Sequence, residues 1–306
     1  MTPFRDYHHL VTTRPHDVQQ VMISDLHLSA SEPALVQAFL SLLSDLQALP
    51  YLRCLYILGD WFDAWIGDDA YLSLSDAEKA SHWITPLIEQ LKQLRLQGCD
   101  IFVMHGNRDF LIGQPFCNTF GGLLIDEPYD IQIGSQHFRL EHGDALCTDD
   151  HAYQRFRKLM RNRLVQWYLL NKSLEKRQKI AAKMRQKSKT DTARKTEFIM
   201  DVNEGAVAQV MLAYDGLLHG HTHRPDIHPV PNSSQSTGTK QSIDANNKDD
   251  TENTHKTRYV LGDWRVLNSG GSREKVEAVI GVVVAEDNDA DEVANDENFM
   301  MVCYTN

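Results

Sequence analysis

Short runs of apolar residues, each ending in a polar or glycine-rich turn, recur through the first half of the chain. They cover residues 21–23, 54–58 and 101–104, and apolar runs of this length between turns are typical of buried β-strands. Between them, residues 33–46 and 77–96 space their apolar side chains as an amphipathic helix does. Strands that alternate with helices in this way predict an α/β fold.

Residues 151–200 differ from the rest of the chain and predict a helical insertion, which we name the cap. The stretch from 151 to 189 contains thirteen Lys or Arg residues and a single acid, Glu175, with apolar and aromatic residues interleaved at helical spacing. A solvated amphipathic helical hairpin has this pattern, and so does a lid or an element that lies on a membrane surface. The pattern alone leaves these alternatives open.

Strands and polar segments are expected to alternate in the second half of the chain. Residues 129–133 and 137–140 predict a strand pair with a Gly-Ser turn between them. Residues 231–257 are rich in Ser, Thr, Asn, Gln and Asp and almost empty of large apolar residues, so burial cannot repay the entropy of ordering them. We expect a disordered loop there, and an acidic excursion followed by a C-terminal strand over residues 286–306.

The composition narrows the class of protein. With 306 residues, of which 42% are hydrophobic and 24% charged, the chain can bury a sizeable core, and one large domain with an insertion is the default. A net charge of -11 argues against a nucleic-acid partner, because phosphate neutralisation needs excess Lys and Arg. Five scattered cysteines fit a reducing compartment. No stretch resembles a secretory signal or a membrane span, so we expect any membrane contact to be peripheral.

Five polar motifs each follow an expected strand or apolar run. Taken singly, each has a plain explanation as a turn or a buried histidine. Together they are hard to ascribe to coincidence, because ligands of open α/β sheets gather outside the carboxyl ends of the strands. Carboxylate, amide and imidazole groups in such a set suit divalent cations. The side chains that we expect to bind two cations are Asp25, His27, Asp60, Asn107, His142, His219 and His221.

The order of these motifs, D-x-H, G-D-x-x-D, G-N-x-D, H-G-D and G-H-x-H, resembles that of the calcineurin-like metallophosphoesterase superfamily over residues 20 to 225. The resemblance implies a calcineurin-like αββα sandwich of two mixed sheets, formed by a domain over residues 20–285 with the cap inserted. It also implies a dinuclear site in which Asp60 bridges the two metals. One metal is then held by Asp25, His27, Asp60 and His221, and the other by Asp60, Asn107, His142 and His219.

Arg108 stands where many superfamily members have a histidine. A guanidinium at this position suits a phosphate leaving group, which needs charge neutralisation more than protonation. With the stretches 59–65, 180–185 and 199–203, Arg108 resembles one branch of the superfamily, the UDP-2,3-diacylglucosamine diphosphatases of lipid A biosynthesis.

The resemblance to this branch implies that a hydroxide activated on the two metals hydrolyses the pyrophosphate of a lipid-linked nucleotide. The products would be UMP and 2,3-diacylglucosamine 1-phosphate. Manganese would be the usual metal, and the enzyme would lie peripherally on the cytoplasmic face of the inner membrane. The substrate-binding positions of the branch fall on Asn107, Arg108, Asp150, Ser188, Thr192, Lys195 and His219.

Other functions on the same core are alternatives. A binding module without catalysis predicts missing ligands, and none of the seven is missing. A nuclease would have to use the basic cap as a local patch, and a protein phosphatase is less compatible with Arg108. The ligand types suit manganese, iron, zinc or cobalt equally, and the acyl-chain preference, the motion of the cap and the oligomeric state are not encoded in any motif.

Overall fold

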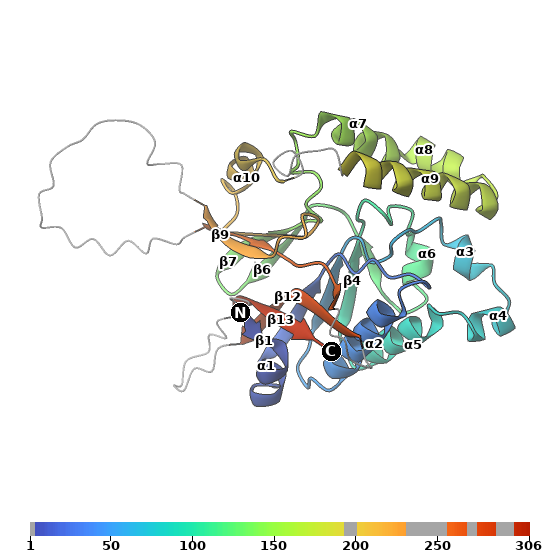
Figure 1. Ribbon diagram of the computed structural model, residues 1–306. Coiled ribbons are helices and arrows are strands. Elements are labelled where there is room, and N and C mark those ends of the chain that lie inside the picture. Colours follow the sequence, from blue (N-terminus) through green and yellow to red (C-terminus); the bar gives the residue numbers. More distant parts are fainter. Residues whose placement is uncertain (1–3, 193–200, 231–255, 268–273, 286–296) are drawn as a thin grey trace, which may run out of the picture.

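The computed structural model describes residues 4–192, 201–230, 256–267, 274–285 and 297–306, with side chains for all of these except 187–192. Two β-sheets pack face to face, and helices cover their outer surfaces (Figure 1). Apolar side chains from both sheets, among them Tyr56, Met104 and Phe138, form the core between them. This arrangement confirms the predicted αββα sandwich.

The first sheet contains the three strands predicted in the first half of the chain. Its order is β1-β13-β12-β2-β3-β4-β5, with β11 beside β12, and β2 to β5 run parallel. The strands are β1 (Arg5–Asp6), β2 (Val18–Ile23), β3 (Cys54–Leu58), β4 (Asp100–Met104), β5 (Leu123–Ile125), β11 (Arg265–Leu267), β12 (Lys275–Ala285) and β13 (Glu297–Thr305). Because β1 and β13 belong to this sheet, it extends beyond the expected range 20–285 at both ends.

Helices α2 (Pro33–Gln47) and α5 (Thr85–Leu96) cover the outer face of the first sheet and bury one apolar side each. The single helix expected at residues 77–96 is instead two: residues 81–84 separate α4 (Asp76–Ala80) from α5, which carries Pro86 in its first turn. Proline has no N–H to continue an earlier helix but is favoured at a helix start. Three further short helices in this half of the molecule are α1 (Tyr7–Thr13), α3 (Asp69–Leu72) and α6 (Gln114–Cys117).

The second sheet has the order β6-β7-β8-β10-β9 and contains the predicted hairpin. Its strands are β6 (Tyr129–Ile133), β7 (Gln136–Leu140), β8 (Gly216–His219), β9 (Asp226–Val230) and β10 (Lys256–Val260). Helix α10 (Glu204–Val210) packs on its outer face. Residues 256 and 257, expected in the loop, begin β10, and residues 231–255 lie outside the described part of the chain.

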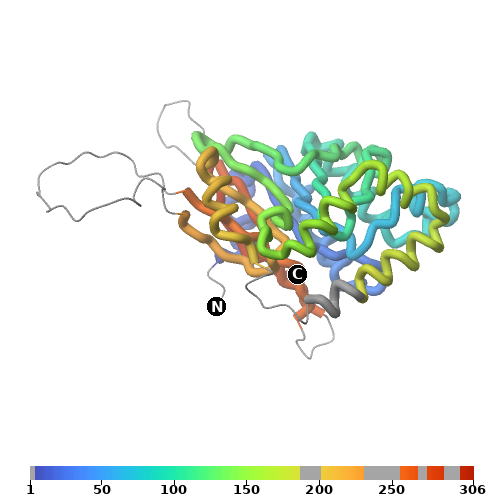
Figure 2. Tube along the Cα trace, turned by 90° about the horizontal axis from the view of Figure 1, so that it is seen from above, coloured from blue at the N-terminus to red at the C-terminus, as the bar shows by residue number. Residues whose placement is uncertain are grey.

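The cap consists of three helices rather than a hairpin: α7 (His151–Met160), α8 (Arg163–Leu170) and α9 (Leu174–Thr192). They lie side by side along one edge of the molecule in both views (Figures 1 and 2). Asp150 and Asn162 begin α7 and α8 by accepting hydrogen bonds from first-turn backbone N–H groups. Within the described residues, no helix is both long and apolar enough to cross a membrane.

Candidate metal centre

Five loops meet at one edge of the two sheets. Those after β2, β3 and β4 carry Asp25, Asp60 and Asn107, and those after β7 and β8 carry His142 and residues 220–223. Backbone hydrogen bonds join neighbouring loops: Asp25 N donates to Gly59 O over 3.1 Å, and Gly220 N donates to His142 O over 3.0 Å. The edge is therefore a rigid platform built from distant parts of the sequence.

The backbone of this platform is strained at specific residues. Among the described residues, the non-glycine positions with positive φ are five, and all belong to these loops: Asp25, His27, Asp60, His221 and His223. Their φ values lie between 50° and 66°, a conformation that costs free energy for residues with a Cβ. Strain of this kind persists where the surrounding structure imposes it, and its clustering marks a functional site.

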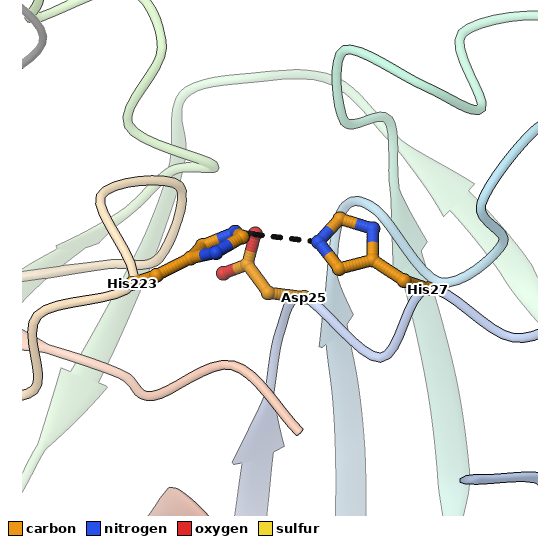
Figure 3. A group of neighbouring side chains, drawn as sticks. All are labelled: Asp25, His27 and His223. Carbon is orange, nitrogen blue, oxygen red and sulfur yellow. Dashed lines mark hydrogen bonds and ion pairs between the residues drawn. The ribbon is translucent and has the colours of Figure 1, made fainter. Parts of the chain in front are cut away.

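Asp25, His27 and His223 form the first group of candidate ligands, and their side chains point toward one another (Figure 3). His223 Nε2 lies 3.3 Å from Asp25 Oδ1 and 3.3 Å from His27 Nε2. One potential ligand atom from each residue falls within a sphere in which all separations are at most 4.8 Å. Oxygen and nitrogen atoms converging at this spacing suit one divalent cation.

Asp60 lies between this group and a second one. Its Oδ2 atom is 3.8 Å from His27 Nδ1, and its Oδ1 atom is 3.8 Å from His142 Nε2. Asn107 Oδ1 is 3.1 Å from the same His142 nitrogen. The ring of His221 lies beside that of His142, with centroids 5.1 Å apart. Asp60 is thus adjacent to both groups, as a bridging carboxylate must be.

The structure does not bring His219 to this cluster. Strand β8 ends at His219, whose side chain is fully buried, with Nδ1 2.9 Å from Gly220 O and Nε2 3.3 Å from Arg258 Nη1. Burial lowers the pKa of His219 to about 3. The following residues turn out of the strand with positive φ at His221 and His223, and there the His221 ring lies beside His142 and His223 Nε2 lies beside the Asp25 carboxylate. Of the three histidines, His221 and His223 therefore lie beside the other candidate ligands, and His219 lies behind them.

The sequence contains a signal for this shift. The pattern G-H-x-H matches Gly220-His221-Thr222-His223, whereas a histidine before the glycine still belongs to the strand. Gly220 is required because a Cβ there would collide with the Asp25 carboxylate and with Ser24. Gly106 has the same role beside Asp60.

A second layer of acidic residues orients the candidate ligands. Asp263 Oδ2 lies 3.4 Å from His223 Nδ1, and Arg265 donates hydrogen bonds both to Asp263 Oδ1 and to His223 O. A carboxylate at Nδ1 leaves the Nε2 lone pair of the histidine facing the cluster. Asp109 accepts from Gly106 N and Trp61 N, both over 2.7 Å, and so joins the loops after β3 and β4. Sequence reasoning included Asp109 as the last residue of the G-N-x-D motif without giving it this role, and it did not identify Asp263.

The electrostatics of the cluster favour cation binding. Burial, with the negative charges of Asp109 and Asp25, raises the pKa of Asp60 to about 7. Burial lowers the pKa of His27 to about 3, which leaves its imidazole neutral. Among the described residues, the buried Nδ1 of His27 has no hydrogen-bond partner. Crowded carboxylates and an unpartnered imidazole nitrogen are what a divalent cation compensates, so these residues fit the metal ions of the predicted site.

A cavity of about 470 Å³ extends from the cluster to the cap. Polar residues line its inner end, among them Asp60, Arg108 and His221. Its outer wall is apolar, with Phe156, Leu169, Ile180 and Met184 from the three cap helices. Asp150 also lines it, whereas the side chains of the expected substrate residues Ser188, Thr192 and Lys195 lie outside the described part of the structure.

Comparison with known proteins agrees with this geometry. The calcineurin-like phosphoesterase family matches residues 21–225, which defines the class. UDP-2,3-diacylglucosamine hydrolases of Pseudomonas entomophila (strain L48) and Histophilus somni (strain 2336) are 41% and 40% identical to the chain, over 80% and 79% of its length and 90% of their own. The hydrolase of Pseudomonas aeruginosa (strain UCBPP-PA14) is 40% identical over 80% of the chain and 90% of its own length. The chain belongs to the calcineurin-like phosphoesterases and, within them, to the UDP-2,3-diacylglucosamine hydrolase family, which confirms the predicted resemblance.

Proposed function

We propose that this protein is a hydrolase that cleaves the pyrophosphate bond of UDP-2,3-diacylglucosamine in lipid A biosynthesis. The products are UMP and 2,3-diacylglucosamine 1-phosphate. The observation that carries the proposal is the cavity, polar beside the carboxylate–histidine cluster and apolar beneath the cap. A substrate with a charged pyrophosphate and two acyl chains matches this cavity, because its charged part suits the polar end and its acyl chains suit the apolar end. The relatives of about 40% identity are named for hydrolysis of this compound.

The proposed ligands of two divalent cations are Asp25, His27, Asp60, Asn107, His142, His221 and His223. This set keeps six of the seven residues expected from sequence and exchanges His219 for His223, on the distances given above. Two bound cations lower the pKa of water toward neutrality and absorb charge on phosphoryl oxygens. Manganese is the metal that we propose, from the resemblance to this branch.

The protein's own residues then bind and orient the substrate. The Arg108 guanidinium is proposed to neutralise a pyrophosphate oxygen, since Nε lies 3.5 Å from Asp60 Oδ2 at the inner end of the cavity. Asn107, Asp150, Ser188, Thr192 and Lys195 are proposed to contact the sugar and phosphates. His219, whose nitrogens face Arg258 and Gly220 O, is left as a support behind the cluster. The apolar wall of the cavity receives acyl chains.

The outer surface of the cap is proposed to lie on the cytoplasmic face of the inner membrane, which makes the protein a peripheral membrane protein. Apolar side chains that face solvent concentrate on α7 and α8: Leu159, Leu164, Trp167, Tyr168 and Leu170. Exposed Arg155, Lys158 and Arg163 accompany them. Apolar groups with interleaved cations are complementary to an anionic lipid surface, and the same cap helices contribute residues to the lining of the cavity.

Incubation of the purified protein and manganese with UDP-2,3-diacylglucosamine tests the function. We expect UMP and 2,3-diacylglucosamine 1-phosphate in equal amounts by mass spectrometry, and no reaction with chelator present. Intact substrate, after metal analysis has shown the site to be filled, would refute the substrate assignment. A folded protein that binds no metal and cleaves no phosphodiester would support a binding module instead.

A further inference from the structure

The loop that follows β3 connects the metal edge to the cap. It carries Asp60 at its start and Asp63 further along and leads to Asp69, the first residue of α3, and α9 of the cap runs beside it. Asp60 belongs to the cluster described above. Asp63 does not reach the cluster, although it lines the same cavity.

The backbone of Arg108 is held without help from Asp63. Its N–H donates to Asp60 Oδ1 over 2.9 Å, and its carbonyl accepts from Trp65 N over 3.1 Å. The guanidinium at the end of the flexible side chain has freedom that these bonds do not remove. Arg108 Nη1 donates to Asp63 Oδ1 over 3.1 Å, and this contact aims Nε at Asp60. Asp63 therefore acts on the direction of the guanidinium alone.

The second carboxylate oxygen of Asp63 accepts a hydrogen bond from Arg185 of α9. Helix α9 has another tie to the same loop, because Arg177 donates to Ile66 O and pairs with Asp69. The Arg177 side chain is only 4% exposed. Of these two attachments of α9, the one through Asp63 also contacts Arg108 of the reaction centre.

We infer that Asp63 is a positioning residue that couples the docking of cap helix α9 to the placement of the Arg108 guanidinium. Without the Asp63 carboxylate, the two guanidinium groups of Arg108 and Arg185 would face each other with like charge across one loop. With the Asp63 carboxylate in place, both guanidinium groups are held in a fixed direction. A substrate that draws α9 onto the loop therefore also positions the Arg108 guanidinium to bind the pyrophosphate. The inference rests on the proposed function and deepens it.

The test is a double-mutant cycle on kcat with Asp63→Asn, Arg185→Gln and the double variant. Each single variant should lower kcat on the order of tenfold. Misplacement of a group by about 1 Å can cost up to about 100-fold, and Arg108 keeps its backbone contacts in both variants. The double variant should lose little beyond either single variant. Asp63→Asn should also add nothing to Arg108→Gln. Asp63→Glu, which keeps the charge, should recover part of kcat.

Controls separate coupling from general damage. Lys179→Gln is the matched control, because it removes a cation of α9 that pairs only with Glu175 among its described neighbours. It should keep kcat within about twofold, on the additivity expected of independent sites. Bound metal, measured by elemental analysis, should equal that of the unaltered protein in every variant.

Three results would overturn the inference: losses that multiply in the double variant, an unchanged kcat in Asp63→Asn, or a fall in metal content that parallels activity. Failure of the proposed function has a different signature, because the unaltered protein would then release no UMP. In that case the same cycle is measured on bis(p-nitrophenyl) phosphate with manganese. Multiplicative losses on that ester would contradict the coupling independently of the natural substrate.

Discussion

The metal edge and the cap are built on opposite principles. At the metal edge, Asp25, Asp60 and His142 are buried on strand ends and fixed by backbone hydrogen bonds between loops. In the cap, α7 and α8 contain no buried residue, and α9 is attached through a few arginines. Reaction chemistry needs sub-ångström placement, which rigid strand ends provide, whereas a lipid substrate needs an apolar cover that can admit it. Substitutions at the metal edge should therefore abolish activity, whereas substitutions in the cap should reduce it only in part.

The largest effect is expected from Asp60→Ala. Because Asp60 is adjacent to both groups of ligands, its loss should remove metal and lower kcat on the order of 10³-fold or more. Elemental analysis and UMP release measure the two consequences. Arg108→Gln is the matched control, because it should slow the reaction with metal retained. Full metal content in Asp60→Ala would contradict the bridging role.

A comparison of His223→Gln with His219→Gln should show the next largest effect. His223→Gln removes a proposed ligand, so metal affinity and kcat should fall roughly 100-fold. His219→Gln alters a buried side chain that faces Arg258, and its main consequence should be a lower melting temperature with metal affinity retained. A larger loss of metal affinity in His219→Gln than in His223→Gln would instead support His219 and His221 as the ligands.

Much of this edge could be predicted from sequence, for a physical reason. The strands before Asp25, Asp60 and Asn107 are short apolar runs, and parallel strands place their carboxyl ends together. The choice among His219, His221 and His223 could not be predicted from alternation, because the positive φ values after β8 break the two-residue period. The contact between Asp63 and Arg185 joins residues 122 positions apart on a loop and a helix, and no local pattern encodes it.

Lys195→Ala should act on binding rather than on metals. Loss of one charge-assisted contact to a substrate phosphate should raise KM roughly tenfold, with metal content and kcat much less affected. Steady-state kinetics with manganese in excess measure both parameters. A loss of bound metal equal to that of Asp60→Ala would contradict this division between edge and cap.

The outer surface of the cap should control attachment to lipid rather than chemistry. Trp167→Ser combined with Leu164→Ser removes side chains that are 65% and 76% exposed. Partitioning onto phosphatidylglycerol vesicles should fall roughly tenfold, while hydrolysis of bis(p-nitrophenyl) phosphate is unchanged. Leu96→Ser, at a position 79% exposed at the end of α5, is the control and should leave vesicle binding intact. Equal losses in both proteins would refute a specific membrane surface.

The smallest effect is expected from removal of residues 231–255. Val230 and Lys256 are directly paired in antiparallel β9 and β10, so an Asn-Gly turn can join the two strands. None of the proposed ligands or substrate residues lies in the removed segment. Activity should stay within about twofold, since shortening a connection costs little. A large fall in kcat would show that the segment takes part in the reaction.

The carboxylate–histidine edge is proposed to hold two divalent cations that act on a lipid-linked pyrophosphate. The sharpest test is a titration of metal-free protein with manganese in which UMP release from UDP-2,3-diacylglucosamine is followed at each step. We expect UMP release to reach its maximum at two manganese ions per chain. Maximal release without metal, or no release with two ions bound, would contradict it.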